Sequence, residues 1–318
     1  MHNFWNINTP AQFEIAALET FKFQSKHCAP YAQYLNLIGC NPQEVTSLDR
    51  IPYLPIELFK THDVYSASTP PEAIFTSSST TGQGEARHMI SHLSTYERAF
   101  TVGFHYFYGS PQNWSIYGLL PSYLEREGSS LIYMVDHLIK QSGSGGFYLN
   151  DYDKLLSDMS HDPRPKILLG VSYALWNLAE SYSPPLRNVV VMETGGMKGH
   201  REELPKSEFH KILCHSFCVD KIHSEYGMAE LTSQAYSMGD NIFSCPPWMN
   251  VTIRDINAPF LTQQTQQRGG INIIDLASYD SCSFIQTQDV GRLFKGGSFT
   301  VEGRIESSDI RGCNLLVQ

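Results

Sequence analysis

The sequence predicts an α/β protein in which a parallel sheet flanked by helices is joined to a smaller antiparallel β subdomain. Two observations support this fold class. Apolar, β-branched runs alternate with helical patterns from about residue 71 to 240, and short alternating runs separated by turn residues follow. A helical pattern precedes both. We therefore expect three parts: a helical segment packed on the main body (1–70), an α/β part (71–240) and a β-rich part with a C-terminal tail (241–318).

In the first part, a helix is expected to begin after Thr9. Thr9 can cap the helix, Pro10 suits its first turn, and Gln12 can reach back to the cap. Apolar residues then recur at helical spacing from Phe13 to Phe21. The segment 51–60 contains two prolines and is expected to be an extended connection into the main body.

In the α/β part, strands and helices are expected to alternate. The strands are 73–75, 88–91, 115–120, 166–170, 188–193 and 221–224, and the helices are 94–108, 126–141, 172–182 and 202–217. A capping box formed by Ser94 and Glu97 is expected to open the helix 94–108. Such alternation predicts a parallel sheet that is covered on both faces. Ligands of these sheets bind beyond the carboxyl ends of the strands, which directs attention to the segments after Glu193 and Ser224.

In the β-rich part, three strands are expected at 250–256, 269–276 and 297–305. They contain alternating apolar residues and are separated by turn residues, as in an antiparallel sheet.

Composition excludes several function classes. Of the 318 residues, 42% are hydrophobic and 17% are charged, which is typical of a globular protein. The net charge is -9 without a basic cluster, so no nucleic-acid partner is expected. The N-terminus lacks the pattern of a signal peptide, and no apolar run reaches the ~20 residues of a membrane span.

The cysteines predict a reducing environment. There are seven of them, without the spacing of a disulfide framework, so we expect reduced thiols and a cytoplasmic location. Cys214 and Cys218 lie near several histidines. Their spacing fits the core and surface of a helix better than a zinc site.

The segment FTSSSTTGQGEAR (75–87) places six consecutive hydroxyl residues and a glycine between two expected strands. Small side chains let backbone N–H groups approach an anion, and hydroxyls add donors, so the segment fits a phosphate-binding loop. A flexible Ser/Thr linker is the alternative. The segment is not a Walker loop, because it lacks the G-K-[ST] sequence and a strand follows it.

Four further segments could contribute to a nucleotide site. After the strand 188–193, two glycines in Thr194-Gly195-Gly196 permit close approach to a flat ligand such as a base. After the strand 221–224, Tyr226 could stack on a base and Glu230 could hold Mg²⁺. Farther on, D-V-G and G-R place Asp289 and Arg304, which suit a ribose diol and a phosphate. Each segment is common by itself, as a turn or a helix entrance.

The order of these segments is more specific than any one of them. A hydroxyl-rich loop, T-G-G, E-Y-G-M-A-E, D-V-G and G-R-x-x-x-S-D follow one another, and this order resembles the adenylate-forming (acyl-CoA synthetase-like) superfamily over about residues 50–313. Within it, the chain most resembles the LuxE-type acyl-protein synthetases. The segments that carry this resemblance are IPYLPIELFK, FTSSSTTG, TGGMKG, SEYGMAELTSQAY, PPWMNVTIRD and RGCNLLV.

The resemblance implies ATP-dependent activation of a carboxylic acid, with a fatty acid expected, to an acyl-adenylate with release of pyrophosphate. It implies ATP and Mg²⁺ as cofactors and the fold of the N-terminal domain of these enzymes. The residues that match the phosphate loop are Ser77, Ser78, Thr80, Thr81 and Gly82. The residues that match the rest of the nucleotide site are Gly195 and Gly196 beside adenine, Tyr226 on the adenine ring, Glu230 at Mg²⁺, Asp289 at the ribose and Arg304 near the hinge.

For the LuxE-type branch, the resemblance implies that Cys313, in R-G-C, receives the acyl group as a thioester. The group then passes to an acyl-accepting protein, either a reductase or a carrier. A thiolate is the nucleophilic form of cysteine, and Arg311 could lower the pKa of Cys313. Arg311 lies two positions before it.

The chain departs from the superfamily at two places. Ser79 stands where the phosphate loop has a glycine, and 83–87 contains no lysine, so only Arg87 could supply charge. Both changes are expected to lower the affinity of the loop for the triphosphate of ATP. The chain is also expected to lack the mobile C-terminal domain of the superfamily with its catalytic lysine, which fits the LuxE branch.

The sequence leaves two alternative functions open. The first is a stand-alone adenylating enzyme that passes its acyl group to CoA or a carrier protein, with Cys313 structural. The second is a non-catalytic homologue that binds a nucleotide or acyl group, for which Ser79 and the absent lysine argue.

Overall fold

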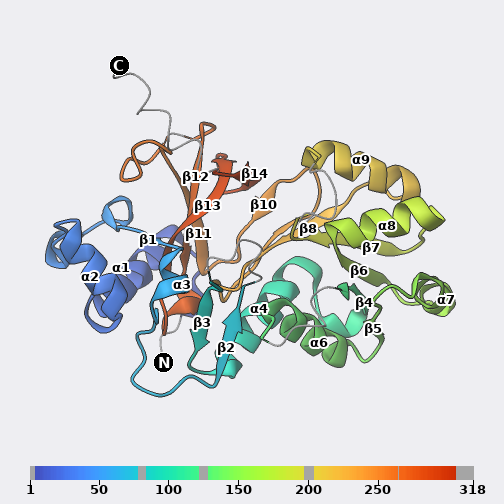
Figure 1. The fold of residues 1–318 in the computed structure, drawn as a ribbon, viewed down its shortest axis with the longest axis horizontal. Coiled ribbons are helices and arrows are strands. Elements are labelled where there is room, and N and C mark those ends of the chain that lie inside the picture. The colour runs from blue at the N-terminus through green and yellow to red at the C-terminus, as the bar shows by residue number, and fades with distance from the viewer. Residues whose placement is uncertain (1–3, 78–83, 122–127, 197–203, 264, 306–318) are drawn as a thin grey trace. The chain divides into compact units, whose positions relative to one another are not determined.

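The computed structural model describes residues 4–77, 84–121, 128–196, 204–263 and 265–305 (Figure 1). The described helices are α1 (Pro10–His27), α2 (Ala29–Leu37), α3 (Leu58–Thr61), α4 (Leu93–Tyr108), α6 (Ser130–Ser142), α7 (Tyr152–His161), α8 (Ser172–Tyr182) and α9 (Lys206–Phe217). Short 3-10 helices are η1 (Phe4–Asn6), η2 (Pro42–Glu44), η3 (Leu48–Arg50), η4 (Pro111–Asn113) and η5 (Leu276–Ser278).

The described residues form two compact units. The first unit combines Met1–Leu58, Val64–Ser68 and Pro247–Gln318, and the second combines Phe59–Asp63 and Thr69–Pro246. The three-part division expected from the sequence stays a prediction.

The first unit is built on an antiparallel sheet. Its strands are β11 (Met249–Arg254), β12 (Arg268–Asp275), β13 (Phe284–Leu293) and β14 (Phe299–Arg304), in that order. The short strand β1 (Leu54–Pro55) runs parallel to β13, with Leu54 opposite Ile285. This sheet is the smaller antiparallel part that the sequence predicts.

Helix α1 begins as the sequence predicts and is joined to this sheet through a buried side chain. Thr9 Oγ1 accepts a hydrogen bond from the Gln12 amide at 3.2 Å, and Gln12 Oε1 accepts one from the Thr9 amide at 3.1 Å. Farther along α1, the amide group of the buried Gln24 donates to the carbonyl oxygens of Ser278 and Tyr279 and accepts from the amide of Ser283. Helix α1 is therefore fixed to residues far along the chain.

The second unit contains the parallel sheet. Its strands are β4 (Ser115–Leu119), β5 (Gly145–Phe147), β6 (Lys166–Val171), β7 (Val189–Thr194) and β8 (His223–Tyr226), which run parallel, and β9 (Ala235–Ser237) and β10 (Phe243–Ser244), which are antiparallel. The strand order is β10-β9-β8-β7-β6-β4-β5. Strands β2 (Ala73–Thr76) and β3 (Arg87–Ile90) form a separate antiparallel pair.

Helices cover both faces of this parallel sheet. In Figure 1, α8 and α9 lie on one side of strands β6–β8, and α4 and α6 lie on the other. All residues of β4 and β6 are buried, which explains their nearly continuous apolar sequence. The core includes Phe100 and Phe104 from α4 and Phe209 and Phe217 from α9. Because β6, β7 and β8 are parallel, their carboxyl ends lie at the same edge of the sheet, between the two helical layers.

The predicted strands and helices are present within a few residues, but some elements were not predicted. Strand β13 contains Asp289 and Gly291, residues that are typical of turns. A bulge explains the glycine, because the register shifts between Val290 and Gly291 and a Cβ at Gly291 would lie 1.9 Å from the carbonyl oxygen of Thr300. Strand β5 and helix α7 were not predicted either.

Two local predictions were wrong. Helix α4 begins at Leu93 rather than after a Ser94 cap, because the carboxylate of Glu72 accepts a hydrogen bond from the Leu93 amide at 2.7 Å. A side chain distant in sequence thus caps this helix. The extended connection expected at 51–60 is extended only as far as β1, and α3 begins at Leu58. None of the described helices is long and apolar enough to cross a membrane.

Candidate active site

The stems of the predicted phosphate loop are described, but most of its hydroxyl residues are not. Strands β2 and β3 lead into and out of the loop, with Thr76 opposite Arg87. The Ser77 amide donates to the Ala86 carbonyl oxygen, and the Ala86 amide donates to Ser77 Oγ, each at 3.0 Å. Ser77 therefore closes the base of the loop. Ser78, Thr80, Thr81 and Gly82 lie outside the described residues.

The single basic residue expected near this loop already has an acidic partner. Arg87 Nη1 lies 3.1 Å from Asp63 Oδ1, and both side chains are largely exposed, at 49% and 66%. A pair this exposed is weak, because solvent screens it. The guanidinium of Arg87 can therefore exchange Asp63 for a phosphate at little cost in stability.

A buried histidine connects the loop stem to the turn that contains Glu230. Nδ1 of His88, on β3, lies 2.8 Å from the carbonyl oxygen of Ala229. Because a carbonyl group only accepts, this nitrogen carries the proton. Burial lowers the pKa of His88 to about 4, so the ring is neutral at pH 7. The sequence prediction missed this residue.

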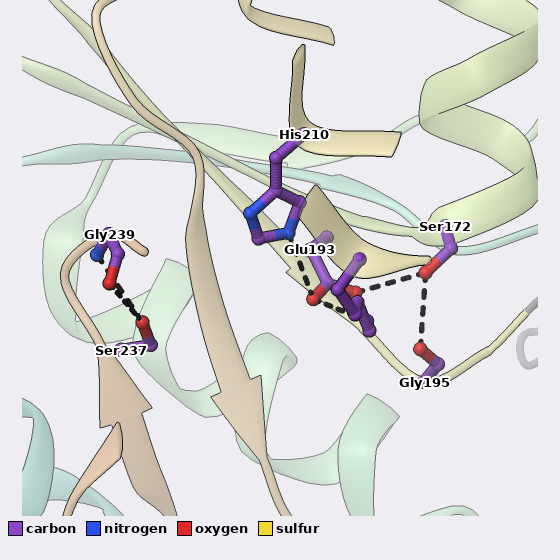
Figure 2. A network of polar contacts seen from close by, with 7 residues as sticks. Ser172, Glu193, Gly195, His210, Ser237 and Gly239 are labelled. Carbon is purple, nitrogen blue, oxygen red and sulfur yellow. Dashed lines mark hydrogen bonds and ion pairs between the residues drawn. The ribbon is translucent and has the colours of Figure 1, made fainter. Parts of the chain in front are cut away.

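The turn after β7 is held by a shared hydroxyl. Gly195 has φ of +68°, a conformation that favours glycine. The hydroxyl of Ser172, at the start of α8, lies 2.9 Å from Glu193 Oε2 and 3.1 Å from the carbonyl oxygen of Gly195 (Figure 2). The Gly195 turn is thereby tied to the first residue of α8. Figure 2 also shows Ser237 and Gly239, which close the turn between β9 and β10.

Glu193 is a buried carboxylate with two basic neighbours from α9. Lys206 Nζ lies 2.5 Å from Glu193 Oε1, and His210 Nε2 lies 3.5 Å from the same oxygen. Burial opposes ionisation of Glu193, but Lys206 and His210 outweigh it and lower the pKa of Glu193 to about 2. Glu193 is therefore ionised at neutral pH and anchors the end of β7 to α9.

Glu225, on the neighbouring strand β8, has the opposite shift. Thr194 Oγ1 donates a hydrogen bond to Glu225 Oε2. Burial raises the pKa of Glu225 to about 7 against the effect of this hydrogen bond, and the charge of Glu193 adds to the rise. Two buried carboxyl groups on adjacent strands thus titrate far apart: Glu193 is ionised throughout the neutral range, and Glu225 takes up its proton near pH 7.

Tyr226 and Glu230 follow at the end of β8. The Tyr226 ring is 8% exposed and packs edge-on against Phe243 at 5.9 Å between centroids. Its orientation is therefore fixed by the fold. Glu230 is 7% exposed and lies in the turn after Ala229. The described residues contain no group of three His, Cys, Asp or Glu side chains able to hold a metal ion.

Asp289 and Arg304 lie in the first unit and contact each other. They are opposite residues on β13 and β14, and Arg304 Nε lies 3.1 Å from Asp289 Oδ1. The Asp289 amide also donates to Thr287 Oγ1 at 3.1 Å. The sequence prediction treated the two residues separately, and the structure brings them together.

The predicted nucleophile, Cys313, lies outside the described residues. Two of the other cysteines, Cys28 and Cys282, are fully buried. Burial raises the pKa of the Cys28 thiol to about 11 and raises that of Cys282 as well, which makes both thiols poor nucleophiles. Cys214 and Cys218 lie near the end of α9, and Cys218 is exposed.

Solved structures share this fold. A 2-hydroxyisobutyryl-CoA ligase in complex with R3-HIB-AMP aligns with 93% of this chain and 68% of its own, at a TM-score of 0.70 and 12% identity. ATP-bound MatB from Rhodopseudomonas palustris aligns with 73% of this chain, at a TM-score of 0.57 and 16% identity. The amide bond synthetase McbA from Marinactinospora thermotolerans aligns with the same share, at 0.54 and 18%.

These neighbours confirm the predicted fold class, the α/β fold of the N-terminal domain of adenylate-forming enzymes. The alignment spans about half the length of MatB, at 48%, and of McbA, at 49%. No protein-family model matches the sequence, and no curated protein matches it.

Site residues at the ends of strands β7 and β8 were predicted from the sequence, but the buried charged residues next to them were not. Glu193, Glu225 and His88 were not predicted to have roles. A signal was present for the two glutamates, because each is a charged residue at the end of an apolar strand, where a carboxylate needs a partner. The partners themselves lie far away in sequence and could not be predicted.

Proposed function

We propose that the protein is an adenylate-forming enzyme that activates a carboxylic acid, in the first instance a fatty acid, with ATP. The acyl group then passes to the thiol of Cys313 and onward to a partner protein. One observation carries the proposal. The parallel strands β7 and β8 end side by side, so that Gly195, Gly196 and Tyr226 meet at one edge of the sheet, with Glu230 in the next turn. The likeness in fold to a ligase in complex with R3-HIB-AMP supports it.

The proposed reaction has two steps. In the first, a carboxylate oxygen of the acid forms a bond to the α-phosphorus of ATP, and the bond from that phosphorus to the β-phosphate oxygen breaks. Pyrophosphate leaves, and the acyl-adenylate remains. In the second, the Cys313 thiolate forms a bond to the acyl carbon, the bond from that carbon to the AMP oxygen breaks, and AMP leaves with the electron pair. The thiol proton goes to solvent or a base.

The proposed nucleotide contacts follow the strand ends. Gly195 and Gly196 let the backbone approach adenine, and Tyr226 offers it a ring face. Asp289 accepts hydrogen bonds from the ribose hydroxyls, and Arg304 pairs with phosphate when it leaves Asp289. Ser77, Ser78, Thr80, Thr81 and Gly82 surround the β- and γ-phosphates with hydroxyl and N–H donors.

Glu230 is the residue proposed to hold Mg²⁺. A carboxylate suits this hard cation, and Mg²⁺ at nucleotide sites is bound by one or two carboxylates together with substrate phosphates. The described residues around Glu230 form no three-ligand metal group, which fits a cation that arrives with ATP. When bound, Mg²⁺ neutralises charge on the departing pyrophosphate.

Adenylation is tested by ATP–pyrophosphate exchange. The protein is incubated with ATP, Mg²⁺ and one acid at a time, from short-chain to long-chain. We expect exchange with at least one acid, and a loss of about a hundredfold or more in Glu230→Ala. Glu208→Ala, an acidic residue in the first turn of α9, is the control. Failure of every acid would refute the adenylation step.

The acceptor is tested by mass spectrometry after incubation with ATP and mixed fatty acids. We expect an acyl group on Cys313 that hydroxylamine releases, and no such adduct in Cys313→Ala. Cys218→Ala, which removes an exposed thiol, is the matched control and should keep the adduct. An acyl group on a residue other than Cys313 would contradict the thioester assignment.

Transfer to CoA or a carrier protein is the second candidate function. The ligase neighbour has also been solved in complex with 2-HIB-AMP and CoA, at a TM-score of 0.68 over 94% of this chain. This candidate predicts that Cys313→Ala forms acyl-CoA or an acyl carrier at the wild-type rate.

Nucleotide binding without catalysis is the third candidate, because Ser79 stands where the phosphate loop of the superfamily has a glycine and 83–87 contains no lysine. ATP binding by calorimetry, without exchange on any acid, would favour it.

A further inference from the structure

We propose that Glu225 is a positioning residue that joins the turn after β7 to the turn after β8, acting through Thr194 and Gly227 rather than by touching the ligand. The inference rests on the proposed function, because the first turn contains the glycines assigned to adenine and the second directly follows Tyr226, the tyrosine assigned to it.

The two oxygens of Glu225 face the two turns. Thr194 is the register partner of Glu225 on the adjacent strand and donates its hydroxyl to Oε2. Gly195 follows Thr194 directly. On the other side, a Cβ added at Gly227 would lie only 2.4 Å from Oε1. One carboxyl group therefore contacts both turns, with Tyr226 between Glu225 and Gly227.

The surroundings of Glu225 are unusual for a carboxyl group. It is 7% exposed. In the described part of the chain, the titratable groups that act on it electrostatically are Tyr96 and Tyr108 from α4, Tyr236 from β9 and Glu193 from β7. These are three phenols and a carboxylate. A buried carboxyl group in such a place is stable only when it is neutral or hydrogen-bonded.

The two carboxyl groups have separate tasks. Successive residues of a strand point to opposite faces, so Glu193 faces α9 with its basic partners and Glu225 faces α4 with its phenols. Glu193 holds the strand end by charge at any neutral pH. Glu225 holds the turns by hydrogen bonding and packing, and its ionisation places a second negative charge near Glu193. The connection that Glu225 makes between the turns after β7 and β8 is therefore expected to weaken as pH rises.

The test compares ATP affinity, measured by calorimetry between about pH 5.5 and 8.5, across four variants. We expect Thr194→Val and Glu225→Ala each to weaken binding about tenfold at the acidic end, as for a lost hydrogen bond. The double variant should be no weaker than either single one. Glu225→Gln, whose amide carbonyl can still accept from Thr194, should keep affinity within about threefold and remove the decline of affinity at alkaline pH.

Matched controls come from α4. Glu97→Gln changes a carboxylate that also accepts from a hydroxyl, that of Tyr133 at 2.6 Å, and Thr101→Val removes a hydroxyl that accepts from Gln141. Neither variant should change ATP affinity or its pH dependence. Thermal unfolding identifies variants that are not folded. If Thr194→Val or Glu225→Ala is not folded, the pH dependence of ATP affinity in Glu225→Gln tests the inference instead.

A second measurement separates this inference from the proposed function. Backbone hydrogen exchange of the peptide 192–196, without ligand, should be faster in Thr194→Val and in Glu225→Ala. If the wild-type protein binds no ATP but hydrogen exchange is faster in the two variants, the proposed function fails and the positioning role of Glu225 is supported. If exchange, affinity and pH profile all match the wild type, Glu225 has no positioning role.

Discussion

Asp289 and Arg304 face each other across the ladder of β13 and β14, with Arg304 Nε 3.1 Å from Asp289 Oδ1. The pair is asymmetric. The Asp289 side chain is 10% exposed, whereas that of Arg304 is 73% exposed. The carboxylate is therefore fixed in place, and the guanidinium can leave it at little cost.

This asymmetry predicts separate effects of the two residues. Arg304→Met should lower the free energy of unfolding by less than about 1 kcal/mol, because the pair is largely solvated. Asp289→Asn should weaken ATP binding about tenfold, because an amide is a poorer acceptor for two ribose hydroxyls. Urea unfolding and calorimetry measure the two effects. Arg292→Met, which removes a similar pair with Glu302 at 3.0 Å, is the control for ATP binding.

Lys206→Met should destabilise the protein strongly. Glu193 is 1% exposed, and loss of the ammonium group removes the nearer of its two basic partners among the described residues, which costs about 3 kcal/mol at pH 7. Lys140→Met is the control, because Lys140 and Asp136 form an exposed pair on one helix and should contribute less than about 1 kcal/mol. Similar losses in the two variants would contradict the assigned role of Lys206.

Glu193 also predicts an acid dependence. Its pKa in the folded protein, about 2, lies below the ordinary value of 4.5, so its contribution to stability is present above pH 4.5 and is lost as pH falls toward 2. In Lys206→Met this loss should be smaller. The slope of the unfolding free energy against pH in that range measures it, and equal slopes would argue against the ion pair.

Glu225→Gln should reduce the pH dependence of the free energy of unfolding in a second range, around pH 7. The pKa of Glu225 is raised from 4.5 to about 7, so its contribution is fully present below pH 4.5 and is lost as pH rises through 7. Removing the titration should make the variant relatively more stable at pH 8 than at pH 5, by about 1–3 kcal/mol. Urea unfolding at the two pH values gives this difference. A constant difference between variant and wild type would show that Glu225 does not titrate there.

His88→Phe tests the connection between β3 and the Glu230 turn. Phenylalanine keeps the ring contact with Phe59 but leaves the Ala229 carbonyl without its donor, which should cost about 1–3 kcal/mol. The pKa of His88 is lowered from 6.5 to about 4, so the wild type loses stability as pH falls through this range, and the variant should lose less. His105→Phe, on the exposed side of α4, should change neither quantity. A neutral His88→Phe would mean that the turn is held by other contacts.

How far the sequence predicted the structure depended on how local each signal was. The cap at Thr9 and the buried strands β4 and β6 were predicted because their causes lie within a few residues. The start of α4 was not, because its cap is Glu72, 21 residues before Leu93. Strand β13 was missed because a glycine such as Gly291, taken by itself, indicates a turn. The bulge that explains this glycine depends on the pairing of β13 with β14, which the sequence does not show.

The candidate site followed the same rule. The order of the glycines, Tyr226 and Glu230 was visible in the sequence, since each follows an apolar strand. The contact between Thr194 and Glu225 depends on the register of β7 and β8, which no single-residue signal encodes. The opposite pKa shifts of Glu193 and Glu225 depend in turn on which helix covers each face of the sheet.

The hydrogen bonds of Gln24 have a consequence for the order in which the protein can fold during synthesis. Gln24 leaves the ribosome well before its partner Ser278, which is 254 positions later. Helix α1 must therefore wait, with its apolar face exposed, while the continuous stretch Thr69–Pro246 is completed and can fold. Helix α1 is made long before the residues that bury it, and during that interval a chaperone has the most apolar surface to protect.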